Sequence, residues 1–131
     1  YKRQPNNRSV VCRLRWTGGS LLLTGDIEQP AEEALCGADC RSDVLKVPHH
    51  GSDTSSTGPF LDAVAPRYAI VSTGAWRGGD RVPHAVLERY RQRGIEVLRT
   101  DRLGGIQVRL LAHSFTISAA RLQRKYPVIQ G

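Results

Sequence analysis

The sequence predicts a mixed α/β (α+β) domain in which strands alternate with helices. The first observation behind this prediction is the period-two alternation of residues 9–16, which is typical of a half-buried strand. The second is a series of short, mainly apolar runs at 21–23, 43–47 and 68–72, which predict further strands. The third is an amphipathic helical pattern at 83–94, which begins at a proline and ends at a glycine.

Two interleaved sets of side chains make up the first strand: an apolar set of Val10, Cys12, Leu14 and Trp16, and a second set of Val11, Arg13 and Arg15. The apolar set predicts the buried side, so we expect Cys12 to lie in the core. The stretch TGGS at 17–20 is typical of a hairpin turn, and the three leucines at 21–23 predict a more buried strand.

A helix is expected at 27–36, where helix formers follow the second strand. Pro30 lies near its first turn, and Glu32 and Glu33 lie where a helix N-terminus favours negative charge. The later elements follow in order: a strand at 43–47, a short helix at 59–65, a strand at 68–72, the helix at 83–94, a strand at 95–100, and a final strand pair at 105–111 and 114–118. The tail at 119–131 is basic and is expected to fray.

The chain has 131 residues, which is enough for one small domain with a modest core. Apolar residues make up 40% of it and charged residues 24%, which are ordinary values for a globular protein. No stretch approaches the roughly 18 to 20 apolar residues of a membrane span. The N-terminus is polar and lacks methionine, so we expect the chain to be a piece of a longer protein. The piece then gives no information about the targeting signals of the whole protein.

The net charge of +7 comes from residues 61–131, because cations and anions balance over residues 1–60. Most of the cations are arginines, whose planar fork suits phosphate. The alternatives are a phosphate-facing surface and a coding bias towards arginine on an ordinary solvated surface. On the first alternative, the candidate nucleic-acid-binding residues lie on the exposed side of the 83–94 helix and in the tail: Arg89, Arg91, Arg93, Arg121, Arg124 and Lys125.

Two of the three cysteines, Cys36 and Cys40, are four residues apart in CGADC. This spacing fits neither a zinc ribbon, which needs a second pair, nor a redox C-x-x-C motif. If the parent protein is exported, we expect the two to form a local disulfide.

The candidate chemistry lies at strand ends. Asp26 follows a buried strand in LLLTGD, where it is either a functional carboxylate or a helix cap. In DVLKVPHHGSDTSS, His49 and His50 follow a strand that a proline stops. One of them would be a metal ligand and the other an acid, base or orienting group, unless both are surface residues of a polar loop. Gly51 would permit close substrate approach, and Ser52 would offer anion-binding groups.

The other two histidines give weaker signals. His84 lies at the second position of the 83–94 helix, where it is either a ligand or a solvent-facing residue of the first turn. His113 lies in the predicted hairpin and is expected to be exposed.

Several strings, LLLTGDIE and LKVPHHGS above all, with PRYAIVS and TDRLGGI in support, resemble the C-terminal metallo-β-lactamase-like domain of the ComEC family of DNA-internalisation competence proteins. The resemblance covers about residues 6–110. It implies an αββα sandwich with a metal site at the strand ends. The first metal motif of that domain, His-x-His-x-Asp-His, has no counterpart here, so the chain resembles the second half of the domain.

The resemblance also implies roles for individual residues. Asp26 matches a carboxylate that bridges two metals, and His49 and His50 match the HHGS string of the family. The family's GHPHP-like stretch reads GDRVPHAVL here, which leaves His84 as the candidate for the last ligand. The implied metal ligands are therefore Asp26, His49, His50 and His84, with Asp26 and His50 catalytic and Gly51 and Ser52 in the substrate loop.

The implied activity is hydrolysis of DNA phosphodiesters during transformation, assisted by a divalent metal, Zn or Mn. The implied partners are single-stranded DNA, bound without sequence preference, and the rest of a parent inner-membrane protein, including the N-terminal half of the domain. The domain would be soluble and lie on the extracytoplasmic face, and the isolated chain would be inactive. The alternatives are a non-catalytic DNA-guiding module with a degraded metal site, and another metallo-hydrolase that acts on a lactone or a small phosphoester.

Overall fold

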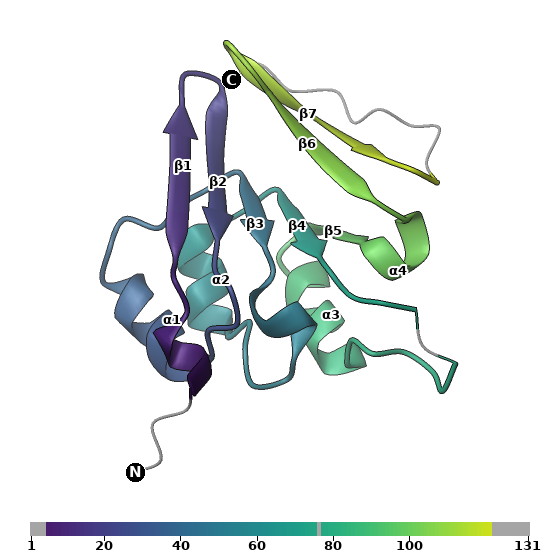
Figure 1. The fold of residues 1–131 in the computed structure, drawn as a ribbon. Coiled ribbons are helices and arrows are strands. Elements are labelled where there is room, and N and C mark those ends of the chain that lie inside the picture. Colours follow the sequence, from purple (N-terminus) through teal and green to yellow (C-terminus); the bar gives the residue numbers. More distant parts are fainter. Residues whose placement is uncertain (1–4, 76, 122–131) are drawn as a thin grey trace.

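The computed structural model describes residues 5–75 and 77–121, which form two β-sheets and flanking helices (Figure 1). The larger sheet is mixed: its strand order is β1-β2-β3-β4-β5, the first pair is antiparallel and the other pairs are parallel. Its strands are β1 (Cys12–Trp16), β2 (Gly19–Leu23), β3 (Val44–Lys46), β4 (Tyr68–Val71) and β5 (Glu96–Arg99). The mixed α/β (α+β) fold class that the sequence predicts is confirmed.

Three helices cover one face of this sheet: α1 (Gln29–Cys36), α2 (Gly58–Val64) and α3 (His84–Arg91) (Figure 1). The larger apolar core lies between them and the sheet and contains Leu45, Phe60 and Tyr90, all fully buried. Leu45 points to the helices, and its neighbour Val44 packs on the opposite face, because successive side chains of a strand alternate. The central strands are therefore buried on both sides, as their apolar runs indicate.

A hairpin of β6 (Ile106–Leu111) and β7 (Ser114–Ala119) covers part of the other face (Figure 1). Phe115 of this hairpin makes edge-to-face contacts with Trp16 and Tyr68 of the main sheet. A one-turn helix, α4 (Thr100–Leu103), joins β5 to the hairpin, where the sequence predicted that the strand would continue to residue 100. Within the described ranges, no helix is long and apolar enough to cross a bilayer.

The prediction that Cys12 lies in the core is wrong. The strand forms as expected, but Cys12 and Leu14 are exposed. The hairpin reaches the last residue of that side, Trp16, whose indole N–H donates to the Ser114 carbonyl at 3.3 Å. On the opposite side of β1, Arg13 donates hydrogen bonds to backbone carbonyls of the segment after α1, so this side is covered. The alternation of residue types does not show which side of an edge strand the rest of the protein covers.

Cys36 and Cys40 are free thiols in the structure, rather than the disulfide expected for an exported parent. Cys40 is buried and Cys36 is exposed at the end of α1. Burial raises the pKa of both thiols, which disfavours the reactive thiolate.

Gly18, in the turn between β1 and β2, allows the hairpin to approach the main sheet. A Cβ atom at residue 18 would lie 2.0 Å from the Ser114 nitrogen and 2.5 Å from the His113 carbonyl carbon. We expect Gly18→Ala to lower the free energy of unfolding by about 1 to 3 kcal/mol, because backbone must move to admit the methyl group. Urea unfolding measures this loss. Gly105→Ala is the control, since its Cβ would have no neighbour within 4 Å, and an equal loss in both variants would contradict the proposed clash.

Candidate metal and phosphate site at the strand ends

The parallel strands β2 to β5 all end at the same edge of the sheet, so the loops after them meet there. Asp26 follows β2, the two histidines follow β3, and Ser72 follows β4. These residues are far apart in the chain, and the parallel order of the strands brings them together.

The histidines lie in a tight 3₁₀ turn, Pro48–Gly51, directly after β3. Both have left-handed backbone angles, with φ of 48° at His49 and 53° at His50, and Gly51 follows with φ of 83°. A non-glycine residue in this region costs on the order of 1 kcal/mol or more, and such strain clusters at functional sites. The turn is held by the His49 N–H, which donates to the Gly25 carbonyl at 3.1 Å, and by the Ser55 hydroxyl, which donates to the Pro48 carbonyl.

His50 is oriented by a backbone carbonyl. Its Nδ1 lies 2.6 Å from the Ser72 carbonyl oxygen, which can only accept, so Nδ1 carries the proton of this hydrogen bond. The Nε2 atom of the neutral ring then has a free lone pair, and it faces the Asp26 carboxylate at 3.5 Å. Two lone-pair donors that face each other at this distance repel unless a proton or a cation lies between them.

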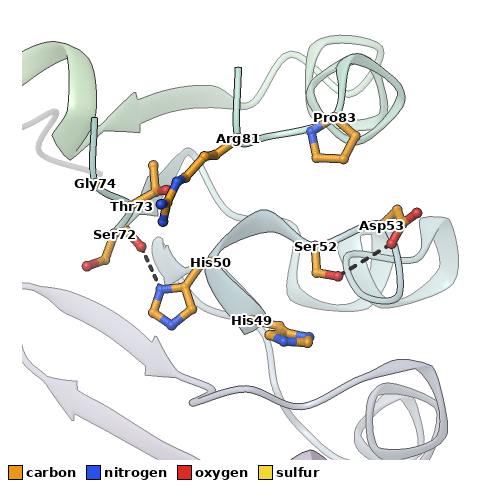
Figure 2. A pocket seen from close by; sticks show the side chains of 9 residues that line it. All are labelled: His49, His50, Ser52, Asp53, Ser72, Thr73, Gly74, Arg81 and Pro83. Carbon is orange, nitrogen blue, oxygen red and sulfur yellow. Dashed lines mark hydrogen bonds between the residues drawn. The ribbon is translucent and has the colours of Figure 1, made fainter. Parts of the chain in front are cut away.

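His49 turns away from Asp26 and towards a different carboxylate. Its Nδ1 lies 3.3 Å from Glu28 Oε1 and 3.4 Å from the Thr54 hydroxyl. Glu28 is almost fully buried, and Asn6 also donates to Oε1. Figure 2 shows the two imidazole rings directed to different sides of the turn. The two adjacent histidines therefore have separate carboxylate partners.

An open cleft of about 810 Å³ lies in front of the histidine turn (Figure 2). Its lining combines the turn, the loop after β4 and the segment before α3: His49, His50, Ser52, Asp53, Ser72, Thr73, Gly74, Arg81 and Pro83. Of the residues predicted for the substrate loop, Ser52 lines this cleft. Gly51 lies behind it, where a Cβ atom would be 3.0 Å from Val82, so the glycine is needed for packing as well as for its positive φ.

The loop after β4 is held by Thr100, the first residue of α4. The Thr100 hydroxyl accepts from the Thr73 N–H at 2.9 Å and donates to the Thr73 carbonyl at 2.7 Å. One residue earlier, the buried Arg99 donates to both Asp80 and Asp101. Sequence reasoning missed these roles, although TDRLGGI was among the strings that resemble the family.

Two other residues near Asp26 were also missed. Lys46 is half-buried beside Asp26, donates weakly to the Gly25 carbonyl at 3.4 Å, and has a pKa that burial lowers. Glu28 is the last residue of LLLTGDIE, two residues after Asp26. This position in the string could have identified it as a second carboxylate of the site.

The ion pair of Arg99 with Asp80 should make stability depend on pH. Hydrogen bonds from Arg99 lower the pKa of Asp80 to about 2, from an ordinary value of 3.8. Because the folded-state pKa is the lower one, the stabilisation by Asp80 is complete above about pH 5 and is lost as the pH falls through about 2. We expect the difference in unfolding free energy between the wild type and Asp80→Asn to be constant at neutral pH and to shrink below about pH 4, as measured by urea unfolding. A difference that does not change with pH would contradict this role.

His84, predicted as the last metal ligand, does not line this cleft. It is exposed at the start of α3 and lines a separate hollow with Leu87, Glu88 and Arg91. Over residues 5–75 and 77–121, no three His, Cys, Asp or Glu side chains are grouped so that they could hold a metal ion. Of the four predicted ligands, Asp26 and His50 are the two whose side chains face each other, with Oδ1 and Nε2 at 3.5 Å. His113 is exposed in the turn between β6 and β7, as predicted.

The arginines predicted on the exposed side of the 83–94 helix have partners within the protein; Arg91 is exposed, whereas Arg89 and Arg93 are partly buried. Arg89 donates to the Ser55 and Ser56 carbonyls. Arg93 forms an ion pair with Asp62 of α2 at 2.7 Å, and Arg91 forms one with Glu88 at 2.5 Å. The charge pattern of a helix does not show which carbonyl or carboxylate groups of other segments its arginines will bind. Arg121 is exposed, whereas Arg124 and Lys125 lie outside the described residues.

Comparison with known proteins gives clear relatives, although no protein-family model matches the chain. The chain is 44% identical over 105 residues to "Competence protein ComA" of Neisseria gonorrhoeae, and the match covers 78% of the chain. It is 38% identical to "ComE operon protein 3" of Bacillus subtilis over 79% of the chain, and 34% identical to "Recombination protein 2" of Haemophilus influenzae over 91%. The chain spans only 15%, 14% and 15% of the lengths of these three relatives.

Proposed function

Because this chain belongs to the ComEC family of competence proteins, we propose that it forms one side of the active site of a metallo-β-lactamase-like domain that hydrolyses DNA phosphodiesters during DNA uptake. The chain corresponds to 15% of the length of the gonococcal relative, so the activity is proposed for the whole protein. We expect the isolated chain to be inactive, since it supplies part of the ligand set.

The pairing of Asp26 with His50 is the observation that carries the proposal. A carboxylate oxygen and an imidazole nitrogen face each other at 3.5 Å, at the strand-end edge where ligand sites of α/β folds lie. The Ser72 carbonyl fixes the His50 tautomer that leaves Nε2 as an electron-pair donor. Both side chains are about half exposed, and His50 lines the cleft.

This donor set fits a divalent cation. Oxygen and imidazole nitrogen are ligands common to Zn and Mn, and a cation between the two groups would remove the repulsion of their lone pairs. A cation held there would supply Lewis-acid stabilisation of phosphate charge and activation of water. The further ligands would come from another segment of the parent protein.

His49 would move protons rather than bind the cation. Glu28 and Thr54 hold its ring at 3.3 and 3.4 Å, and its side chain is about one-third exposed at the cleft. The Glu28 carboxylate and the Thr54 hydroxyl fix the position of the ring, as general acid–base catalysis requires of a group that transfers protons. In this proposal Asp26 and His50 bind the cation, and His49 exchanges protons with the reacting oxygens.

The substrate in this proposal is a single DNA strand, bound without sequence preference through its phosphates. The parent would be an inner-membrane protein that presents this domain on its extracytoplasmic face. The proposed partners are therefore the DNA strand and the rest of the parent, including the half of the domain that would carry the remaining ligands.

A second candidate function is a non-catalytic module that guides DNA. The observation that favours it is the lining of the cleft, where Arg81 and Pro83 stand in the stretch that corresponds to the family's GHPHP-like sequence, while His84 lies outside. An arginine holds phosphate without a metal.

Replacement of the aligned segment in the gonococcal competence protein ComA by this chain tests the proposed function. The two are 44% identical, so we expect the chimera to fold and to support transformation of the bacterium by added DNA. Transformation at the level of a deletion strain, although the chimera is present in normal amount, would overturn the proposal. A chimera that still transforms with Asp26→Asn, and whose purified form never cleaves DNA, would instead establish the DNA-guiding function.

A further inference from the structure

We propose that Arg81 is a phosphate-binding residue of the cleft, which holds the phosphodiester backbone of a single DNA strand opposite the Asp26–His50 pair. The inference rests on the proposed function, because it names a substrate contact of the same site. It is independent of the metal, because the contact is between a guanidinium group and a phosphate.

The position of Arg81 separates the cleft into two halves. Figure 2 shows its side chain reaching from the upper wall of the cleft towards Ser72 and Thr73, with the histidine turn on the other side. The half with the histidine turn presents His50, whose Nε2 faces Asp26 and would be a donor for a cation. The half with Arg81 presents a cationic fork, so a phosphate group between them would meet positive charge from both sides once a cation is bound.

The residues on either side of Arg81 are both fixed. Asp80 accepts two hydrogen bonds from the buried Arg99, at 3.0 and 2.5 Å, and also accepts from the Val82 N–H. Val82 is fully buried and packs against Gly51 of the histidine turn. Arg81 is exposed between two anchored neighbours, so little backbone entropy would be lost when it binds a ligand.

The size and polarity of the cleft fit a nucleic acid backbone. Its volume of about 810 Å³ is large for one phosphate and comparable to the pockets that hold drug-sized ligands. Hydroxyl groups of Ser52, Ser72 and Thr73 line it, whereas Asp53 at its edge, which accepts from Ser52 at 3.5 Å, would oppose an anion on that side.

The test is the binding of a labelled single-stranded oligothymidylate of roughly eight nucleotides to the full 131-residue chain, with a chelator present, measured by fluorescence anisotropy over a range of salt. We expect Arg81→Gln to weaken binding by roughly five- to tenfold and to lower the log–log salt slope by about 0.7. Arg109→Gln, on the exposed side of β6, removes the same charge far along the chain and should change both quantities less. Equal effects of the two variants would show that only diffuse charge attracts DNA and would overturn the proposal.

A second variant, which removes a negative charge instead of a positive one, distinguishes a specific contact from diffuse attraction. Asp80→Asn raises the net charge, so diffuse attraction predicts tighter binding, whereas loss of the Arg99 anchor predicts weaker binding because Arg81 is released. We expect weaker binding, with thermal unfolding used to confirm that the variant is folded.

Tighter binding by Asp80→Asn, equal binding of an uncharged methylphosphonate oligonucleotide, or no saturable binding by the wild type would each overturn the role of Arg81. These readouts need no metal and no catalysis. They can therefore fail while the chimera still supports transformation, and they can succeed while it does not.

Discussion

Replacement of Asp26 by alanine is expected to lower metal-dependent hydrolysis of single-stranded DNA by the complete chimeric protein at least about 100-fold. Loss of a group that only orients a ligand costs 10- to 100-fold in metal affinity or activity, so loss of a ligand itself should reach or exceed the upper limit. Asp26 faces His50 Nε2 at 3.5 Å, and alanine removes one of the two donors that this chain brings together. The measurement is cleavage of a labelled strand with Mn or Zn, together with calorimetry of metal binding.

Two control variants separate this effect from general damage. His113→Ala removes a histidine that is exposed in the β6–β7 turn, and Asp39→Ala removes an exposed carboxylate after α1. We expect both to retain activity close to that of the wild type. Equal losses in Asp26→Ala and His113→Ala, at unchanged stability, would remove the basis of the site assignment.

Replacement of Glu32 by alanine is expected to lower the free energy of unfolding by about 3 to 5 kcal/mol. Glu32 is fully buried in α1, and its two carboxylate oxygens accept from the Ser56 N–H at 2.6 Å and the Thr57 N–H at 2.9 Å. Alanine would leave the buried Ser56 N–H and the partly buried Thr57 N–H without this acceptor and would open a cavity. Since natural domains are stable by about 5 to 15 kcal/mol, this loss would be a large part of the total.

The effect of Glu32 should extend to the cleft. Ser56 also bonds Tyr90 of α3 at 2.8 Å, and Arg89 donates to the carbonyls of Ser55 and Ser56. The loop that Glu32 anchors begins directly after the histidine turn, so a loosened loop should release the strained angles of His49 and His50. Burial raises the pKa of Tyr90, which keeps its hydroxyl group protonated in this network.

Glu33 provides a matched control for Glu32, because it is the next residue of α1, carries the same charge and is exposed. Its side chain accepts a hydrogen bond from Gln29 on the helix surface. We expect Glu33→Ala to change the free energy of unfolding by about 0.5 kcal/mol or less, as measured by urea unfolding. Similar losses in the two variants would mean that the buried carboxylate does not anchor the loop.

Much of the fold could be predicted because its signals are local. The apolar runs at 43–47 and 68–72, and the proline and glycine that bound 83–94, depend on a few neighbouring residues. The strand-end positions of Asp26, His49 and His50 followed from the same signals. The short helix at Thr100–Leu103 and the exposure of Cys12 could not be predicted, because both depend on where the β6–β7 hairpin packs.

The sequence by itself determined the order of strands and helices and the placement of a carboxylate and two histidines at strand ends, because periodicity and turn residues act over short distances along the chain. Only the tertiary structure decided which histidine faces Asp26, that Glu28 is the partner of the other, and that Arg81 lies in the cleft while His84 lies outside it. The two histidine–carboxylate pairs are 21 and 24 residues apart in the chain. These contacts arise from the parallel pairing of β2 with β3 and from the left-handed backbone angles of His49 and His50. The residues next to each histidine or carboxylate in the sequence show neither the strand pairing nor these angles.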